Sequence, residues 1–409
     1  MNLPVLDNLT AKPVTPAFSP TGFETGPKSI AAVRVLRISV TDRCNFRCLY
    51  CMPEAGVAWL PREDILSFEE INEVVRAAIA IHGIRRFKLT GGEPTIRHGI
   101  VDLVRKLRKI DGIQDLSLTT NGMLLEGLAQ PLKEVGLDRI TVSLDSLQPD
   151  RFRRITRTGD LATVLRGLHR AEDVGFASMK INCVTMRGTN DDEFADFARL
   201  TLARRLTVRF IEYMPLGDAA LLHHVGSASA DENTLTPRIP VGSASADEVA
   251  PAASLRPRID TQEIGPAGGC GARGGEDRGA DAFIPESQVR ARIESELGPL
   301  LPVDRASEAG VGPAIPYRLA AGDPLGRIAF ISAMSQPFCA TCNRLRLTAN
   351  GILRSCLFEG GEVNIRDILR GHEAEPRPAA LAHAMSECVR LKPDLHTHHG
   401  TTQMSRIGG

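Results

Sequence analysis

The chain has 409 residues, of which 43% are hydrophobic and 24% are charged, an ordinary composition for a globular protein with room for two domains. Its 49 lysine and arginine residues balance its 49 aspartate and glutamate residues, so no chain-wide field favours nucleic acid or an anionic membrane, and we expect neither as a partner. The sequence has no secretory leader and no run of about 18 apolar residues, which predicts a cytoplasmic protein. Six of its nine cysteines stand in two tight groups, as expected of metal-binding thiols in a reducing compartment.

Composition divides the chain into four parts. Residues 1–30 are rich in proline and are predicted to form a mobile tail, whereas residues 31–216 and 283–409 carry the periodic patterns of ordered domains. Between these domains lies a low-complexity insertion, 217–282, in which the segment VGSASADE occurs twice. Because the insertion is rich in Gly, Ala, Ser and Pro and poor in large apolar residues, we predict that it is disordered.

The predicted elements of the first domain alternate in type. Runs of β-branched and aliphatic residues predict strands at 35–40, 87–90, 115–119, 139–144, 179–184 and 207–213. The first helix is predicted to begin at a capping box of Ser67 and Glu70 and to end near Gly83. This alternation predicts an α/β fold: a partial (β/α)6, TIM-like barrel, with a C-terminal α+β extension that closes its open side.

Three cysteines, Cys44, Cys48 and Cys51, follow the first predicted strand at CxxxCxxC spacing. Three thiolates in one loop can hold three irons of a four-iron, four-sulfur cluster and leave the fourth iron open. The alternative is a zinc site, but structural zinc takes a closed set of four ligands, and no fourth ligand is close in the sequence. We therefore favour the cluster.

Polar motifs follow the later strands at their carboxyl ends. Gly91-Gly92-Glu93-Pro94 follows the second strand, residues 119–122 the third, 143–145 the fourth and 209–214 the sixth. Loops at this end of a barrel share one rim, so these motifs should face the cysteine loop. Glycines allow the backbone to approach a ligand closely, and the Glu93 carboxylate could accept from an ammonium group.

A second cysteine group, Cys339, Cys342 and Cys356, lies in the C-terminal domain. A hairpin closed by Asn350-Gly351 should bring the third cysteine back to the first two. A zinc knuckle is the alternative, yet the lack of an obvious fourth ligand favours a second cluster with an open iron.

Basic residues gather where burial would be costly without an anion. Arg344 and Arg346 alternate on one strand beside the second cysteine group, and guanidinium groups bind phosphate oxygens in pairs. Further basic residues stand within predicted barrel strands: Arg37, Lys88, Lys180 and Arg209. These residues predict a small, anionic substrate.

The two cysteine groups, Tyr50 before the last cysteine of the first group, the Gly-Gly-Glu-Pro motif and the terminal Gly408-Gly409 together resemble the GTP 3',8-cyclases. These are radical S-adenosylmethionine enzymes of molybdenum cofactor biosynthesis. The resemblance covers about residues 31–216 and 283–409.

The resemblance implies a reaction and its cofactors. The first cysteine group would hold a 4Fe-4S cluster that binds S-adenosyl-L-methionine, whose cleavage yields a 5'-deoxyadenosyl radical. That radical would take the hydrogen from C3' of GTP, and C3' would attack C8 of guanine to form (8S)-3',8-cyclo-7,8-dihydroguanosine 5'-triphosphate. A second 4Fe-4S cluster, on Cys339, Cys342 and Cys356, would anchor the guanine. The resemblance also implies three partners of the protein: an external one-electron donor, a downstream cyclic pyranopterin monophosphate synthase and a second copy in a homodimer.

The resemblance also implies the binding residues. S-adenosylmethionine would be held by Tyr50, Gly92, Ser143 and Met214, to which we add Glu93 and Asn121. GTP would be held by Arg37, Lys88, Thr119, Lys180, Arg344, Leu345 and Arg346, with Arg209 as a triphosphate contact and with Arg344 and Arg346 also serving catalysis.

Three features depart from the family pattern or fall outside it. The family commonly has Lys-x-Arg where this chain has Arg86-Phe87-Lys88, so a point charge replaces a fork at that position. The insertion has no counterpart in the family pattern. His396, His398 and His399 are predicted to lie in a solvated C-terminal segment.

Two alternatives remain open beside the cyclase. One is a radical enzyme that modifies a peptide and carries an auxiliary cluster. The other is a non-enzymatic zinc or iron-sulfur sensor.

Overall fold

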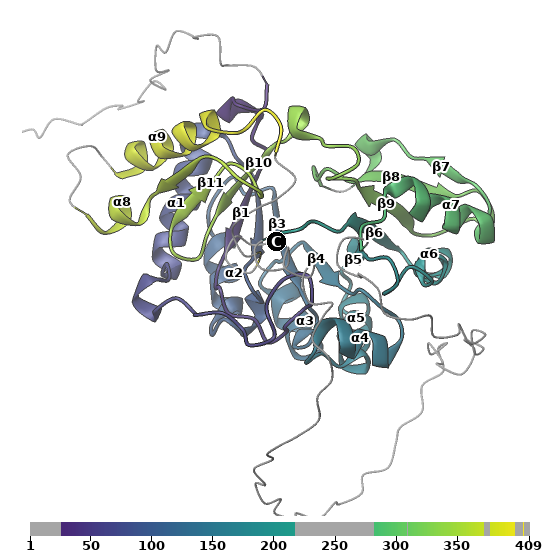
Figure 1. The fold of residues 1–409 in the computed structure, drawn as a ribbon. Coiled ribbons are helices and arrows are strands. Elements are labelled where there is room, and N and C mark those ends of the chain that lie inside the picture. Colours follow the sequence, from purple (N-terminus) through teal and green to yellow (C-terminus); the bar gives the residue numbers. More distant parts are fainter. Residues whose placement is uncertain (1–25, 217–281, 309, 372–376, 397–403, 405–409) are drawn as a thin grey trace, which may run out of the picture.

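The computed structural model describes residues 26–216, 282–308, 310–371, 377–396 and 404 (Figure 1). Most of the predicted N-terminal tail, the insertion apart from Ala282, and Gly408-Gly409 lie outside these described residues.

The described strands form one open sheet in the order β12-β11-β10-β1-β2-β3-β4-β5-β6-β9-β8-β7 (Figure 1). Its six central strands are parallel: β1 (Val35–Ser39), β2 (Arg86–Thr90), β3 (Asp115–Thr120), β4 (Arg139–Ser143), β5 (Met179–Thr185) and β6 (Leu206–Glu212). The prediction of six parallel strands in a partial barrel is therefore confirmed, and the sheet stays open.

Helices follow the central strands: α1 (Phe68–His82), α2 (Ile100–Arg108), α3 (Leu125–Glu134), α4 (Pro149–Thr156), α5 (Leu161–Asp173) and α6 (Phe194–Ala203). The predicted capping box of α1 is present, since Ser67 Oγ accepts from the Glu70 amide and Glu70 Oε2 accepts from the Ser67 amide. Gly83 ends this helix with φ of 64°, a left-handed conformation that glycine adopts without steric cost. Helix α4 was not predicted.

The C-terminal residues extend the sheet at both edges. At one edge β10 (Arg344–Leu347) pairs in parallel with β1 and is followed by β11 (Ile352–Arg354) and β12 (Glu362–Asn364). At the other, β9 (Arg327–Ile331) pairs in parallel with β6 and is followed outward by β8 (Ile315–Leu319) and β7 (Leu300–Pro302). The β10–β11 pair is the predicted hairpin. The C-terminal part is therefore α+β, but its strands lengthen the sheet instead of joining its edges.

Three helices and five short 3-10 turns complete the described chain. The helices are α7 (Glu286–Leu297), α8 (Arg366–Arg370) and α9 (Arg377–Arg390), the last of which lies beside α1 (Figure 1). The turns are η1 (Ile30–Ala32), η2 (Arg62–Asp64), η3 (Pro94–Ile96), η5 (Arg305–Ser307) and η6 (Cys339–Thr341). Across these described ranges, no helix combines the length and apolarity needed to cross a membrane.

The main core lies between the sheet and its helices, and strand alternation decides what faces it. Leu36 and Ile38 of β1 and Phe87 and Leu89 of β2 are fully buried against the helices. The residues between them, among which is Arg37, point to the opposite face of the strands, toward the inside of the partial barrel. This second face carries the polar site.

Candidate active site

The cysteine loop after β1 packs directly on the Gly-Gly-Glu loop after β2. The amide of Gly92 donates to the carbonyl of Thr41, and the amide of Glu93 donates to the carbonyl of Arg43, both at 2.8 Å. A Cβ added at Gly92 would lie 2.2 Å from the Arg43 carbonyl oxygen, so only glycine fits. The predicted contact between these two loops is therefore present in the structure.

Glu93 joins three loops through one buried carboxylate. It accepts hydrogen bonds from the Thr95 amide at 3.0 Å and hydroxyl at 2.5 Å, the Thr120 hydroxyl at 2.7 Å and the Asn121 amide at 2.6 Å. Asn121 Nδ2 in turn donates to Asn45 Oδ1 of the cysteine loop at 2.7 Å. Burial raises the pKa of Glu93 despite these donors. Gly92, Glu93 and Asn121 therefore hold the cysteine loop in place, and none of them lines the large cavity described below.

None of the eight cysteines of the described residues forms a disulfide. Cys44, Cys48 and Cys51 are half-buried, and burial, reinforced by the charge of Glu93, raises the pKa of Cys44 to about 11. Within the described ranges, no three His, Cys, Asp or Glu side chains are grouped to hold a single metal ion.

A cavity of about 270 Å³ lies inside the partial barrel. It is lined by predicted site residues from the central strands and from both loops and strands of the C-terminal part: Arg37, Tyr50, Lys88, Thr119, Ser143, Lys180, Arg209, Met214, Cys339, Cys342, Arg344, Arg346 and Cys356. The expected convergence of these residues therefore exists in the structure. Among the residues predicted to hold GTP, only Leu345 does not line the cavity, because it alternates with its two arginine neighbours and its side chain is fully buried in the core. The first cysteine group, Cys44, Cys48 and Cys51, does not line it either.

Strand register sets the cations of this cavity side by side. Arg37 of β1 is paired with Arg346 of β10 on one side and with Lys88 of β2 on the other. Burial lowers the pKa of Arg37 well below its ordinary value, and the neighbouring charges of Arg346, Arg344 and Arg209 lower it further. Burial and then Arg344 lower the pKa of Arg346 to about 9. Like charges held together in a buried site lower one another's pKa, and an anion between them would reverse the effect.

The far wall of the cavity continues this pattern. Burial and then the charge of Arg209 lower the pKa of Lys88, while burial, Arg209 and Arg139 lower that of Lys180 to about 7. Lys88 and Arg209 both donate to one hydroxyl, that of Thr141, at 3.2 and 3.3 Å.

Several buried polar atoms of the cavity residues have no hydrogen-bond partner among the described residues: Thr119 Oγ1, Asn182 Oδ1 and Arg209 Nε. Buried polar atoms are normally satisfied, so these atoms indicate that a polar ligand or water belongs in the cavity.

The second cysteine group lines the same cavity beside these cations. Cys339 and Cys342 bracket the turn before β10, and Arg344 Nη2 lies 3.7 Å from Cys342 Sγ. Burial by itself would raise the pKa of Cys342, but the positive charges of Arg344 and Lys392 outweigh it and lower the pKa to about 7. Thiolates are metal ligands, so Cys342 is electrostatically prepared to bind metal, whereas burial raises the pKa of Cys339.

Two features of the site were not predicted from sequence. Tyr50 donates its hydroxyl to Asp145 Oδ2 at 2.8 Å, which ties the cysteine loop to the end of β4. His396 is buried, lines the cavity and stacks on Phe358, so the prediction of a solvated segment is wrong for this residue, whereas His398 and His399 lie outside the described residues.

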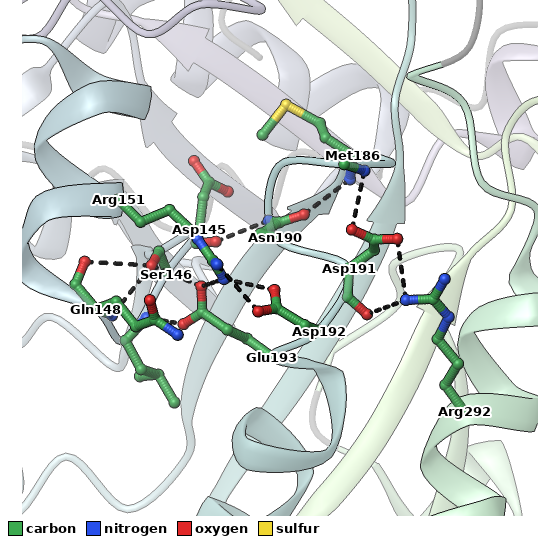
Figure 2. Close-up of polar contacts among 12 residues, drawn as sticks. Asp145, Ser146, Gln148, Arg151, Met186, Asn190, Asp191, Asp192, Glu193 and Arg292 are labelled. Carbon is green, nitrogen blue, oxygen red and sulfur yellow. Dashed lines mark hydrogen bonds and ion pairs between the residues drawn. The ribbon is translucent and has the colours of Figure 1, made fainter. Parts of the chain in front are cut away.

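Asp145 is held by β5 and by the loop that follows it. Its carboxylate accepts from the Val184 amide at 2.8 Å, and its backbone carbonyl accepts from Asn190 Nδ2 at 2.7 Å. Glu193 accepts from the Ser146 hydroxyl at 2.8 Å and from Arg151 at 2.6 Å, which braces the same loop from the other side (Figure 2). Burial raises the pKa of Asp145 to about 6. These contacts thus hold the Asp145 carboxylate against the hydroxyl of Tyr50 in the cysteine loop.

The open parallel sheet and its three-cysteine loop define a radical S-adenosylmethionine protein, and a model of the radical SAM superfamily matches residues 38–201. A second model, Molybdenum Cofactor Synthesis C, matches residues 272–398. A curated GTP 3',8-cyclase of Pelotomaculum thermopropionicum is 41% identical over 381 residues, which cover 92% of this chain and 98% of the relative. GTP 3',8-cyclases of Moorella thermoacetica and Pseudomonas putida strain F1 are 40% and 38% identical, covering 92% and 88% of this chain and 98% and 89% of the relatives. The chain belongs to the GTP 3',8-cyclase family.

Proposed function

We propose that the chain converts GTP to (8S)-3',8-cyclo-7,8-dihydroguanosine 5'-triphosphate, the first step of molybdenum cofactor biosynthesis. Family membership supports the reaction. The single observation that supports GTP as the substrate is a row of buried cations, Arg346, Arg37 and Lys88, which strand register sets side by side. These cations line a cavity that is also lined by a three-cysteine group. A buried row of like charges needs a polyanion, and a nucleoside triphosphate supplies one.

The residues of the first cysteine loop fit a 4Fe-4S cluster. Cys44, Cys48 and Cys51 are three thiols in one loop, none of them in a disulfide, and that loop is held by backbone hydrogen bonds to the Gly-Gly-Glu loop. With S-adenosylmethionine bound, the cluster would supply the electron that releases a 5'-deoxyadenosyl radical. The protein's own contribution is a loop whose position is set by Gly92, Glu93 and Asn121.

S-adenosylmethionine would be held between this loop and the cavity. Tyr50, Ser143 and Met214 all line the cavity at the ends of the loop, β4 and β6, and they are the side chains we propose as contacts. Asp145 keeps the Tyr50 ring oriented through the hydroxyl hydrogen bond. For Gly92, Glu93 and Asn121 we propose an indirect role through the cysteine loop.

GTP would occupy the basic part of the cavity. We propose Arg37, Lys88, Lys180 and Arg209 as triphosphate contacts, with Thr119 as a hydroxyl contact. Lys88 can neutralise phosphate oxygens as a point charge but cannot form the two parallel hydrogen bonds of an arginine. Arg209 can supply this paired geometry from the neighbouring wall. GTP bound inside the partial barrel would displace water from the cavity, which would protect a reactive radical.

The second cysteine group fits a second 4Fe-4S cluster, and we propose Cys339, Cys342 and Cys356 as its ligands. The three thiols line the cavity, and Arg344 lies against one of them. When bound, this cluster would supply an open iron to anchor the guanine base. Arg344 and Arg346 would orient the nucleotide beside it, and Leu345 would contribute through its backbone.

The wider context follows from this chemistry. Each turnover consumes one electron for radical formation, so we propose an external one-electron donor. A cyclic pyranopterin monophosphate synthase would use the product, and the chain would act as a homodimer in the reducing cytoplasm, where thiolate-bound clusters survive. Residues 31–216 would form the radical-generating domain and 283–409 the domain of the second cluster.

Anaerobic reconstitution with iron and sulfide, followed by metal analysis, tests this proposal. We expect about eight iron atoms per chain, and 5'-deoxyadenosine on addition of reductant, S-adenosylmethionine and GTP. Zinc at both cysteine groups, or no 5'-deoxyadenosine, would contradict it. Arg37→Met should weaken GTP binding without changing iron content, which separates loss of substrate binding from loss of a cluster.

A further inference from the structure

The segment that follows α9 reverses the usual distribution of residue types. Leu391 and Leu395 are 51% and 61% exposed, whereas Lys392 and His396 are only 3% and 7% exposed. Lysine is almost never fully buried without a partner, because its ammonium loses hydration there. In this segment two polar side chains are therefore buried while two leucines are exposed, and the contacts of the polar side chains explain why.

Lys392 contacts the turn that leads from the second cysteine group into β10. Its Nζ donates to the carbonyl of Cys342 at 3.1 Å and to the carbonyl of Arg344 at 3.3 Å. In the part of the chain that the structure describes, no carboxylate lies within ion-pair distance of this ammonium. Two neutral carbonyls accept hydrogen bonds from the Lys392 ammonium but do not neutralise its positive charge. A buried charge of this kind requires an anion nearby.

His396 contacts the two remaining parts of the same group. Its ring stacks on Phe358, two residues after Cys356, with centroids 4.1 Å apart and an angle of 7° between the rings. Its Nε2 lies 2.9 Å from the carbonyl oxygen of Ala333, so this nitrogen carries the proton and donates. The backbone of His396 also hydrogen-bonds the Cys339 sulfur.

The turn after Cys356 packs on the end of α9 without space for a side chain. A Cβ added at Gly361 would lie 2.4 Å from Ser355 Oγ and 2.8 Å from the Cys388 carbonyl, and Cys388 Sγ donates to the Gly361 carbonyl at 3.1 Å. The end of α9 and the following residues, 388–396, thus contact every piece of chain that carries a cysteine of the second group.

We propose that residues 392–396 form a clamp that assembles the second cysteine group, and that Lys392 supplies its counter-charge. The inference rests on the proposed second cluster and deepens it. A 4Fe-4S core of charge 2+ with three thiolates is a net monoanion, and its reduced form is a dianion. Lys392, together with Arg344, stabilises this charge, and the effect is larger for the reduced form. Charge and hydrogen bonding around a cluster set its potential, so removing the ammonium should make the potential more negative.

The test compares Lys392→Met, which keeps side-chain length without charge or donor, with two other variants. Lys28→Met is the matched control, because Lys28 pairs with Asp394 of the same segment at 2.8 Å on the surface and does not contact the cysteines. Lys392→Arg restores the charge. Each holoprotein is reconstituted anaerobically, its iron and sulfide are counted, and the potential of the second cluster is titrated by electron paramagnetic resonance.

We expect Lys392→Met to hold its second cluster roughly 10- to 100-fold more weakly, so that iron falls from about eight toward about four atoms per chain. The second cluster that remains should have a more negative potential, Lys392→Arg should recover both properties, and Lys28→Met should match the wild type. Equal iron and equal potential in Lys392→Met and the wild type would overturn the clamp while leaving the proposed function intact. A wild type that binds only about four irons would overturn both.

His396→Phe gives an independent test if Lys392→Met does not fold. This variant keeps an aromatic ring against Phe358 and loses the donor to Ala333. Faster loss of iron from the second cluster during chelation, with the first cluster unchanged, supports the clamp. Wild-type retention of both clusters contradicts it.

Discussion

The lowered pKa of Lys180 predicts that GTP binding takes up a proton. Burial, Arg209 and Arg139 lower this pKa to about 7 in the free protein, whereas a bound triphosphate would raise it toward its ordinary value near 10.5. At about pH 8, roughly one-tenth of the free protein carries the Lys180 proton, so binding should take up about 0.9 proton at this residue. The sign follows directly: affinity is greatest below the free-state pKa and falls as pH rises through it, by up to roughly tenfold per pH unit.

Calorimetry can measure this uptake. Binding of GTP to the holoprotein, without reductant or S-adenosylmethionine, is measured at about pH 8 in two buffers with different ionisation enthalpies. The terminal phosphate of GTP is already ionised there, so the protein supplies the signal. Lys180→Met should take up about 0.9 proton less than the wild type. Lys106→Met is the control, because Lys106 is exposed and pairs with Glu69 away from the cavity.

Equal uptake in Lys180→Met and the wild type would refute the reasoning. It would show that Lys180 already carries its proton in the free cavity, or that the triphosphate does not approach it. The same conclusion would follow if GTP affinity fell with pH as steeply in Lys180→Met as in the wild type.

Three further predictions concern single residues. Arg209→Met should weaken GTP binding by roughly 10- to 100-fold, the effect of losing charge-assisted hydrogen bonds, while S-adenosylmethionine binding measured by equilibrium dialysis stays the same. Gly92→Ala should prevent stable cluster loading, since the new Cβ would meet the Arg43 carbonyl at 2.2 Å, whereas Gly127→Ala in α3, with nothing within 4 Å, should load normally and be about 0.5–1 kcal/mol more stable. The stability of Asp145→Asn relative to the wild type, measured by urea unfolding, should increase by roughly 1 kcal/mol between about pH 5 and pH 7. The reason is the raised pKa of Asp145, about 6, which means that ionising this buried carboxyl destabilises the native wild type as pH rises. A stability difference that does not change with pH would argue against a buried, titrating carboxyl.

Local patterns account for most of what could be predicted. The alternation of apolar runs and amphipathic segments is enough to indicate the parallel sheet, and the Ser67–Glu70 capping box marks the start of α1. The inward direction of Arg37 and Lys88 follows from strand periodicity, since each lies between two core residues. The same periodicity excludes the Leu345 side chain from the cavity, although family resemblance had grouped it with its neighbours.

Contacts between distant residues could not be predicted. Tyr50 and Asp145 are separated by 95 positions, and nothing in either local pattern indicates that they meet. Docking of β10 on β1 and of β9 on β6 joins both edges of the sheet to later residues, which short-range periodicity does not encode. The burial of His396 in a short polar segment depends on Phe358 and Ala333, which are only adjacent in the folded chain.

Transfer of deuterium from C3' of GTP tests the central claim most directly. The reconstituted holoenzyme is incubated with reductant, S-adenosylmethionine and GTP deuterated at C3', and the 5'-deoxyadenosine is examined by mass spectrometry. We predict one deuterium in the 5'-deoxyadenosine together with a cyclised triphosphate in equal amount. Unlabelled 5'-deoxyadenosine with no cyclised product, from enzyme that carries both clusters, would contradict the proposal that the basic cavity presents C3' of GTP to the radical.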